Sequence, residues 1–226
     1  MGKRKGWSWG KLSLGREVVR ALFHWLCGMA MWLIMHPLPI PDVAVWICGV
    51  VIFATFMVFR HVRGSRAVRF ASFNHVIDRW LARDVEKGQM TAAWPTYVGC
   101  LFAWVIICAC NTRWIGALTA LLFGMVDPLA RLGMKWPITK RFKNEKSWGG
   151  LLFGFLGGLL AVGLIAIVCH CGVPLVAAPR FEILVIVYAV GVVSASLFEL
   201  RGGRWDNFII PAGTTVAMTV AYYALL

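Results

Sequence analysis

Residues 126–150, VDPLARLGMKWPITKRFKNEKSWGG, separate two strongly apolar runs and decide how the chain folds. The preceding run covers residues 114–126, and the following run covers residues 150–169. The stretch between them begins with an acid, ends in a Lys-Ser-Trp-Gly-Gly turn and carries six Lys and Arg residues. Apolar runs that flank a short charged loop are typical of membrane helices joined on one side of a bilayer.

The composition of the whole chain agrees with a membrane protein. Of its 226 residues 60% are hydrophobic, with 12 Trp and 14 Phe, and the mean hydropathy is +0.73. Soluble domains contain about 45–50% apolar residues. A membrane-spanning helix needs about 20 apolar residues, so this length allows several such helices and no separate soluble domain.

The apolar runs predict an all-α, polytopic membrane helix bundle of about seven transmembrane helices, forming one domain over residues 1–226. The first run follows a basic tail and could imitate a signal peptide. It continues into a Pro-rich segment without a small-x-small cleavage site, so we interpret it as an uncleaved span. The fourth span is expected to stop at Asp127-Pro128. The predicted spans cover residues 21–35, 43–59, 94–110, 114–126, 150–169, 181–197 and 208–226.

The distribution of charge predicts the orientation of this bundle. With seven spans, all of the 23 Lys and Arg residues except Arg113 and Arg180 lie on one side, which the positive-inside rule identifies as the cytoplasm. The N-terminus is then cytoplasmic. Most of the acids lie on the same side, which the rule does not require and which indicates a polar site there. We attribute the net charge of +13 to topology and to anionic membrane lipids, not to nucleic acid.

Residues 66–86 combine apolar side chains at helical spacing with interleaved arginines. This pattern predicts a basic amphipathic helix in the membrane interface, where it would bind lipid headgroups or cover a site as a lid. A solvated connector docked on the bundle is the alternative interpretation.

Seven cysteines, an odd number within apolar stretches, do not form the spaced framework of a secreted disulfide protein. Most are interpreted as small core residues. The pairs Cys108/Cys110 and Cys169/Cys171 lie at predicted outer ends of spans, which leaves open a soft-metal site or a disulfide if those ends meet.

Three carboxylates lie where predicted spans reach the cytoplasm. Asp127 and Glu199 each end a span, and Asp206 precedes the last one. Carboxylates at the mouth of a bundle can hold a divalent cation such as Mg²⁺, and a nucleoside triphosphate would supply further oxygen ligands. Loop cations could then bind the phosphates, and a carboxylate could serve as the base for an acceptor hydroxyl. The alternative is that these acids only cap helix ends or pair with nearby cations.

The residues just described resemble a known family. DPLA at 127–130 and KSWGG at 146–150 are similar to the GD-x-x-A and K-[ST]-x-E-G motifs of the CTP-dependent lipid-alcohol kinases, which include dolichol, phytol and diacylglycerol kinases. DNFIIP at 206–211 resembles their D-N-[LF]-x-[IV]-P motif, and EVVRALFH at 17–24 resembles their E-x-x-R-K-x-x-H motif. The resemblance covers the beginning, middle and end of the chain in the family's order.

Three positions depart from these motifs. Val126 stands in place of Gly, Ala21 in place of Lys and Gly149 in place of Glu. The missing acid at Gly149 either shifts its role to Glu145 or Glu199, or signals a changed activity.

The resemblance implies transfer of the terminal phosphate of CTP, or of another nucleoside triphosphate, to the hydroxyl of a lipid alcohol such as diacylglycerol, polyprenol/dolichol or phytol. It also implies a divalent cation, Mg²⁺, at the catalytic site. The absence of a P-loop or protein-kinase loop from the sequence fits a nucleotide site of another kind. The implied catalytic and metal residues are Asp127, Glu199 and Asp206, and the implied nucleotide-binding residues are Lys140, Arg141, Lys146, Ser147, Asn207, Arg20 and His24.

Two other functions compete with this hypothesis. A phosphatidate cytidylyltransferase would also use CTP and magnesium at a membrane face, but its H-G-G-x-x-D-R-x-D signature is not in the sequence. A non-enzymatic transporter or scaffold for anionic lipid would share the cytoplasmic cations. Transporters tend to place ionisable residues near mid-bilayer and to contain internal repeats, and the sequence shows neither.

Overall fold

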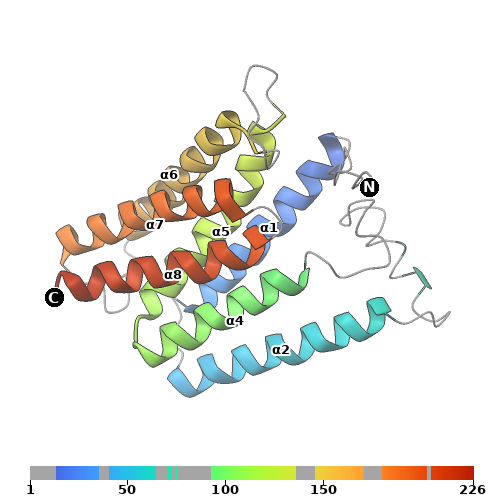
Figure 1. Ribbon diagram of the computed structural model, residues 1–226. Coiled ribbons are helices and arrows are strands. Elements are labelled where there is room, and N and C mark those ends of the chain that lie inside the picture. The colour runs from blue at the N-terminus through green and yellow to red at the C-terminus, as the bar shows by residue number, and fades with distance from the viewer. Residues whose placement is uncertain are drawn as a thin grey trace, which may run out of the picture.

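The computed structural model of the chain describes residues 14–35, 41–64, 71–72, 75, 93–135, 146–170, 180–202 and 205–226. These residues form an all-helical bundle (Figure 1), as the sequence predicts. The helices of the described part are α1 (Leu14–Met35), α2 (Asp42–Gly64), α4 (Ala93–Ala109), α5 (Arg113–Gly133), α6 (Trp148–His170), α7 (Phe181–Gly202) and α8 (Asp206–Ala224).

Three of the described helices are long and apolar enough to cross a membrane, in the segments Arg113–Gly133, Trp148–Ile167 and Phe181–Arg201. In α6 and α7 only 33% and 39% of the most apolar window is buried. Large side chains such as Leu160 and Ile167 of α6 are therefore exposed on the outside of the bundle. Exposed apolar surface of this extent fits contact with lipid.

α5 is the central helix of the bundle. It packs against α1, α4, α6, α7 and α8, and 78% of its most apolar window is buried. Ile115, Leu118 and Leu122 of α5 are almost completely inaccessible and contribute to the hydrophobic core. Because α5 is surrounded, a polar side chain on it is held inside the bundle.

Glycines allow α1 and α6 to lie close to α5. A Cβ atom added to Gly28 of α1 would lie 2.7 Å from the carbonyl oxygen of Ala120 and 3.0 Å from the Cα of Gly124. On α6, a Cβ atom on Gly157 would lie 2.8 Å from the carbonyl oxygen of Met125. Small residues permit such close backbone contacts between membrane helices, where packing provides much of the association energy. The glycines of α6 therefore serve its packing against α5.

The fourth span is predicted to stop at Asp127-Pro128, but the helix does not end there. α5 continues through Pro128 to Gly133. Proline removes one backbone hydrogen bond, but the turn persists when neighbouring groups hold it. Arg131 Nε donates a hydrogen bond of 2.9 Å to Asp127 Oδ1 across this turn, and Ala130 faces the glycines of α6. Asp127 consequently lies within a helix and not in a loop.

Other helices also extend beyond their apolar runs at the end where charged side chains gather. α1 begins at Leu14 and not at residue 21, α7 continues to Gly202 and not only to residue 197, and α8 begins at Asp206 and not at residue 208. Polar residues in a terminal turn still make helical backbone hydrogen bonds, so hydropathy alone ends a helix too early.

Two predictions fall mainly on residues that the structure does not describe. Only three positions of the predicted amphipathic helix at 66–86 are described, all of them helical. Cys110 is a free cysteine, and Cys171 lies outside the described residues.

The close contact between α5 and α6 predicts that Gly157→Ala lowers the thermal unfolding temperature of the detergent-solubilised protein. The added methyl group would meet the Met125 carbonyl oxygen, and overpacking of this kind costs about 1–3 kcal/mol. Gly163→Ala in the same helix is the control, because no described atom lies within 4 Å of its added Cβ atom. It should leave stability unchanged or raise it by up to about 1 kcal/mol. Equal effects of the two substitutions would contradict the packing role of Gly157.

Candidate functional site

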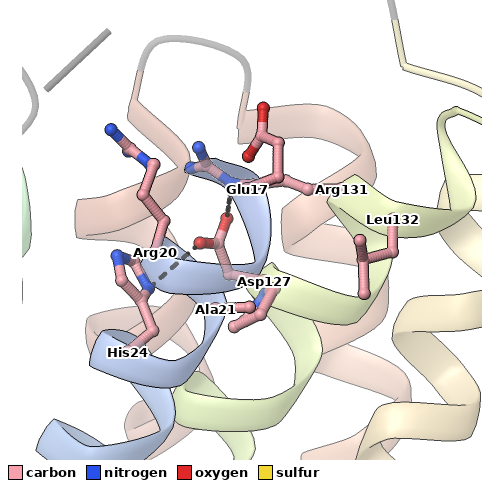
Figure 2. A pocket seen from close by; sticks show the side chains of 8 residues that line it. Glu17, Arg20, Ala21, His24, Asp127, Arg131 and Leu132 are labelled. Carbon is pink, nitrogen blue, oxygen red and sulfur yellow. Dashed lines mark hydrogen bonds and ion pairs between the residues drawn. The ribbon is translucent and has the colours of Figure 1, made fainter. Parts of the chain in front are cut away.

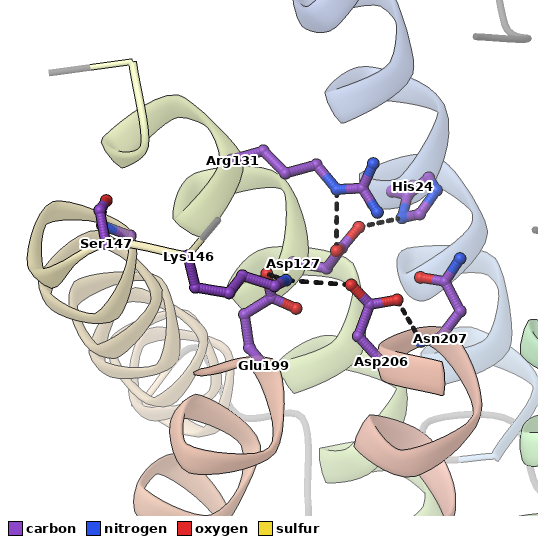
Figure 3. A network of polar contacts seen from close by, with 9 residues as sticks. His24, Asp127, Arg131, Lys146, Ser147, Glu199, Asp206 and Asn207 are labelled. Atoms are coloured by element: carbon purple, nitrogen blue, oxygen red, sulfur yellow. Dashed lines mark hydrogen bonds and ion pairs between the residues drawn. The ribbon is translucent and has the colours of Figure 1, made fainter. Parts of the chain in front are cut away.

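Three buried carboxylates, which we call the acidic trio, meet at one end of the bundle (Figure 3). Asp127 comes from the C-terminal part of α5, Glu199 from the last turn of α7 and Asp206 from the first position of α8. One oxygen of each lies within 4.8 Å of the others, and the three residues are only 1%, 2% and 4% exposed. The fold thus brings together acids that are far apart in the chain.

Asp127 is held from two helices. Arg131, one turn further along α5, donates through Nε to Asp127 Oδ1 at 2.9 Å. His24 of α1 places Nδ1 3.2 Å from Asp127 Oδ2, and its ring packs against Phe123 with the centroids 5.6 Å apart. These contacts fix the carboxylate between α1 and α5.

Lys146, just before α6, contacts the other two acids. Its Nζ donates to Asp206 Oδ2 at 3.0 Å and also to Glu199 Oε1. Burial of Lys146 alone would lower its pKa, but Glu199 and Asp206 outweigh this effect and raise the pKa above its ordinary value. The ammonium therefore stays charged at neutral pH and compensates part of the trio's negative charge.

Two further predicted residues lie at helix starts. Asp206 Oδ1 accepts a 2.7 Å hydrogen bond from the Asn207 N–H, and the N-terminus of α8 favours a negative charge by about 0.3–1 kcal/mol. Ser147 Oγ accepts a 3.1 Å hydrogen bond from the Gly150 N–H and so caps α6. Figure 3 shows Asn207 beside the trio and the Ser147 side chain apart from it.

The described residues fit a divalent cation. With all three carboxyl groups ionised, as metal ligation requires, the trio has three negative charges, whereas Lys146 and Arg131 supply two positive ones. Glu199 Oε2 is buried and has no hydrogen-bond partner among the described residues. An unsatisfied buried polar atom costs about 1–3 kcal/mol or more, which a bound cation would offset. Oxygen-only ligands are those that Mg²⁺ and Mn²⁺ prefer.

A pocket lies between α1 and α5, on the side of Asp127 that faces α1 (Figure 2). Asp127 belongs both to this pocket and to the acidic trio, so a molecule in the pocket would lie next to the trio. One part of the pocket wall is apolar and the other is charged or polar. The lining residues are Ala21, Pro128 and Leu132 on the apolar part and Glu17, Arg20, His24, Asp127 and Arg131 on the polar part.

Arg131 is a member of the site that the sequence did not reveal. Ending the helix at Pro128 hides the i, i+4 relation between Asp127 and Arg131, which is the signal that a continuous helix would have given. Arg20 is buried and lines the pocket. Glu17, which is partly buried, also lines it. The predicted nucleotide-binding residues Lys140 and Arg141 lie outside the described residues.

Gly149, where the resembling family has Glu, is buried at the start of α6. Three carboxylates nevertheless converge without an acid at this position. Of the two residues that could take over the role, Glu199 lies in the trio and Glu145 lies outside the described residues.

The chain matches no protein-family model, no curated protein and no solved structure. The function of the site is therefore inferred from its own residues.

The acidic trio predicts that Glu199→Gln weakens Mn²⁺ binding by at least about tenfold, because even residues that only support metal ligands contribute that much. Electron paramagnetic resonance of the free Mn²⁺ ion measures this affinity. Glu182→Gln is the matched control, since Glu182 is an exposed acid in the first turn of the same helix. Unchanged Mn²⁺ affinity in Glu199→Gln, or an equal loss in the control, would contradict the metal site.

Proposed function

We propose that this protein is a membrane phosphotransferase that moves the terminal phosphate of CTP, or of another nucleoside triphosphate, to the hydroxyl of a lipid alcohol such as diacylglycerol, a polyprenol or phytol. The observation that carries the proposal is the acidic trio with Lys146 at the end of a bundle whose outer faces are apolar. Ionisable groups buried in such a bundle are costly and mark functional sites by default.

The proposed topology has seven spans, with the N-terminus in the cytoplasm and the site at the cytoplasmic face. The dimensions of α7 support this placement. Glu182 and Glu199 lie near opposite ends of this apolar helix, and their separation of 17 residues corresponds to about 26 Å along its axis. This length is close to the roughly 30 Å of a bilayer's hydrocarbon core, so the trio lies near the membrane interface, where a nucleotide can reach it from the cytosol.

Phosphoryl transfer depends mainly on positioning and on neutralising charge. A divalent cation held by Asp127, Glu199 and Asp206 would supply much of that neutralisation for the donor's phosphates. Lys146 lies within hydrogen-bonding distance of two of these acids, so its ammonium is close enough to reach phosphate oxygens beside them. Lys140 and Arg141, six and five residues before Lys146 in the chain, are proposed to bind the remaining phosphates.

The α1–α5 pocket is the proposed binding site for the acceptor. Its polar wall can orient a hydroxyl beside Asp127, and the small space admits this end of the acceptor while the alkyl chain stays in the bilayer. The outer side of α1 exposes Leu22 and Leu26, so a lipid can approach the pocket sideways from the bilayer. The donor and the acceptor would then meet at Asp127 from different sides.

The reaction is tested by incubating the purified protein with CTP labelled on the terminal phosphate and with diacylglycerol, phytol, farnesol and polyprenol in turn. A labelled lipid phosphate and CDP are the expected products. Asp127→Asn should lower the rate by about 100-fold or more, as expected for a group that stabilises charge in the transition state, whereas Glu182→Gln should retain it. Release of pyrophosphate would indicate cytidylyl transfer instead. Lipid binding without any transfer would favour a scaffold.

The acceptor pocket is tested by Ala21→Trp, which fills it from α1. The KM for the lipid alcohol is expected to rise at least about tenfold, equivalent to about 1.4 kcal/mol, because the acceptor loses its space. The KM for CTP should stay within about twofold, since the donor arrives elsewhere. Leu33→Trp is the control, because Leu33 is 45% exposed near the other end of α1 and does not line the pocket. A rise in the KM for CTP alone would place the donor in this pocket and refute the assignment.

A further inference from the structure

Lys146 occupies the position between two acids that a divalent cation would need. Its Nζ donates to Glu199 Oε1 and, at 3.0 Å, to Asp206 Oδ2. A metal ion coordinated by the trio requires oxygens of the same two carboxylates. The ammonium and the metal ion therefore compete for the same two carboxylates.

We propose that Lys146 is a tethered counter-cation that a divalent metal ion must displace, and that it makes the site selective for divalent over monovalent cations. This inference deepens the proposed function and rests on it only for the destination of the released ammonium, which is the donor's phosphate.

The charges at the site explain the selectivity. Metal ligation requires ionised carboxylates. Counted so, the trio has three negative charges against the two positive charges of Lys146 and Arg131 that bond to it, a net charge of −1 for these five groups. A divalent ion that replaces the ammonium brings the net charge to zero. A monovalent ion that replaces the ammonium leaves the net charge at −1, so the exchange neutralises no further charge. In a buried site of low dielectric constant, one uncompensated charge is costly, so only the divalent exchange is favoured.

The local backbone allows this exchange without unfolding. Ser147, the next residue, caps α6 through the Gly150 N–H, so the backbone beside Lys146 is anchored. The lysine side chain itself is flexible along its four-carbon stem and can turn its ammonium away from the acids. Glu199 Oε2, which has no hydrogen-bond partner among the described residues, is available to the metal before Lys146 leaves. Entry of the metal ion and release of the ammonium can therefore proceed in steps.

Mn²⁺ binding to the full-length protein in lipid nanodiscs, without nucleotide or lipid alcohol, tests the proposal. Lys146→Met keeps an unbranched four-atom stem and removes the ammonium group. This variant is expected to bind Mn²⁺ at least about tenfold more tightly than the original protein, because no ammonium competes for the carboxylates. Potassium ions at about 200 mM should weaken Mn²⁺ binding more in the variant than in the original protein. Lys135→Met is the control, since Lys135 is partly exposed, lies outside the trio and places its Nζ 4.0 Å from Glu17 Oε1. Unchanged or weaker Mn²⁺ binding by Lys146→Met overturns the proposal.

A second measurement uses the unsubstituted protein and does not depend on how the variant folds. Acetylation of lysines by a water-soluble acylating reagent, followed by mass spectrometry, reports the accessibility of each amine. Lys146 is only 6% exposed, so its modification should be slow. Mg²⁺ should accelerate acetylation of Lys146 several-fold relative to Lys135. Protection of Lys146 by Mg²⁺, or no change, would show that the metal does not displace it.

Neither measurement contains a nucleotide or a lipid alcohol. Displacement of Lys146 by metal in a protein that fails the transfer assay would therefore support the exchange while refuting the kinase. Transfer activity in a protein whose Lys146 does not respond to metal would refute the exchange alone.

Discussion

The burial of three carboxylates against two cations is the constraint on which the rest of this structure depends. Removing an ion from water costs several kcal/mol even after relaxation, and this cost is offset only when partners are close and well oriented. The partners come from different elements: Arg131 from α5, His24 from α1 and Lys146 from the segment before α6. Five helices, α1, α5, α6, α7 and α8, are thereby required to meet at one place.

The glycines bring α1 close enough to α5 to satisfy this requirement. A Cβ atom on Gly124 would lie 3.3 Å from the carbonyl oxygen of His24, and the next turn of α5 carries Asp127. The close crossing of Gly28 and Gly124 thus lies one turn from the contact between His24 and Asp127. Packing and chemistry are linked here, because a wider crossing would separate the histidine from the carboxylate.

Hydropathy predicted the helical class and the approximate position of each described helix, because long apolar runs admit few other structures in a membrane. It failed at the polar ends, where α5 passes through Pro128 and α7 continues past residue 197. The positions of Asp127, Glu199 and Asp206 at span ends were readable from the chain. Their convergence, and the partnership of Lys146 with two of them, depend on packing between distant segments, which no local spacing encodes.

In the proposed function, the acidic trio, Lys146 and the α1–α5 pocket form one site that would join a charged donor to an apolar acceptor. The most direct test is the anomalous scattering of Mn²⁺ in crystals of the protein with a non-hydrolysable CTP analogue. A metal site at the trio predicts one metal peak about 2.0–2.3 Å from oxygens of Asp127, Glu199 and Asp206, with Lys146 turned towards the phosphates. A metal peak elsewhere, with Lys146 still bound to Glu199 and Asp206, would contradict it.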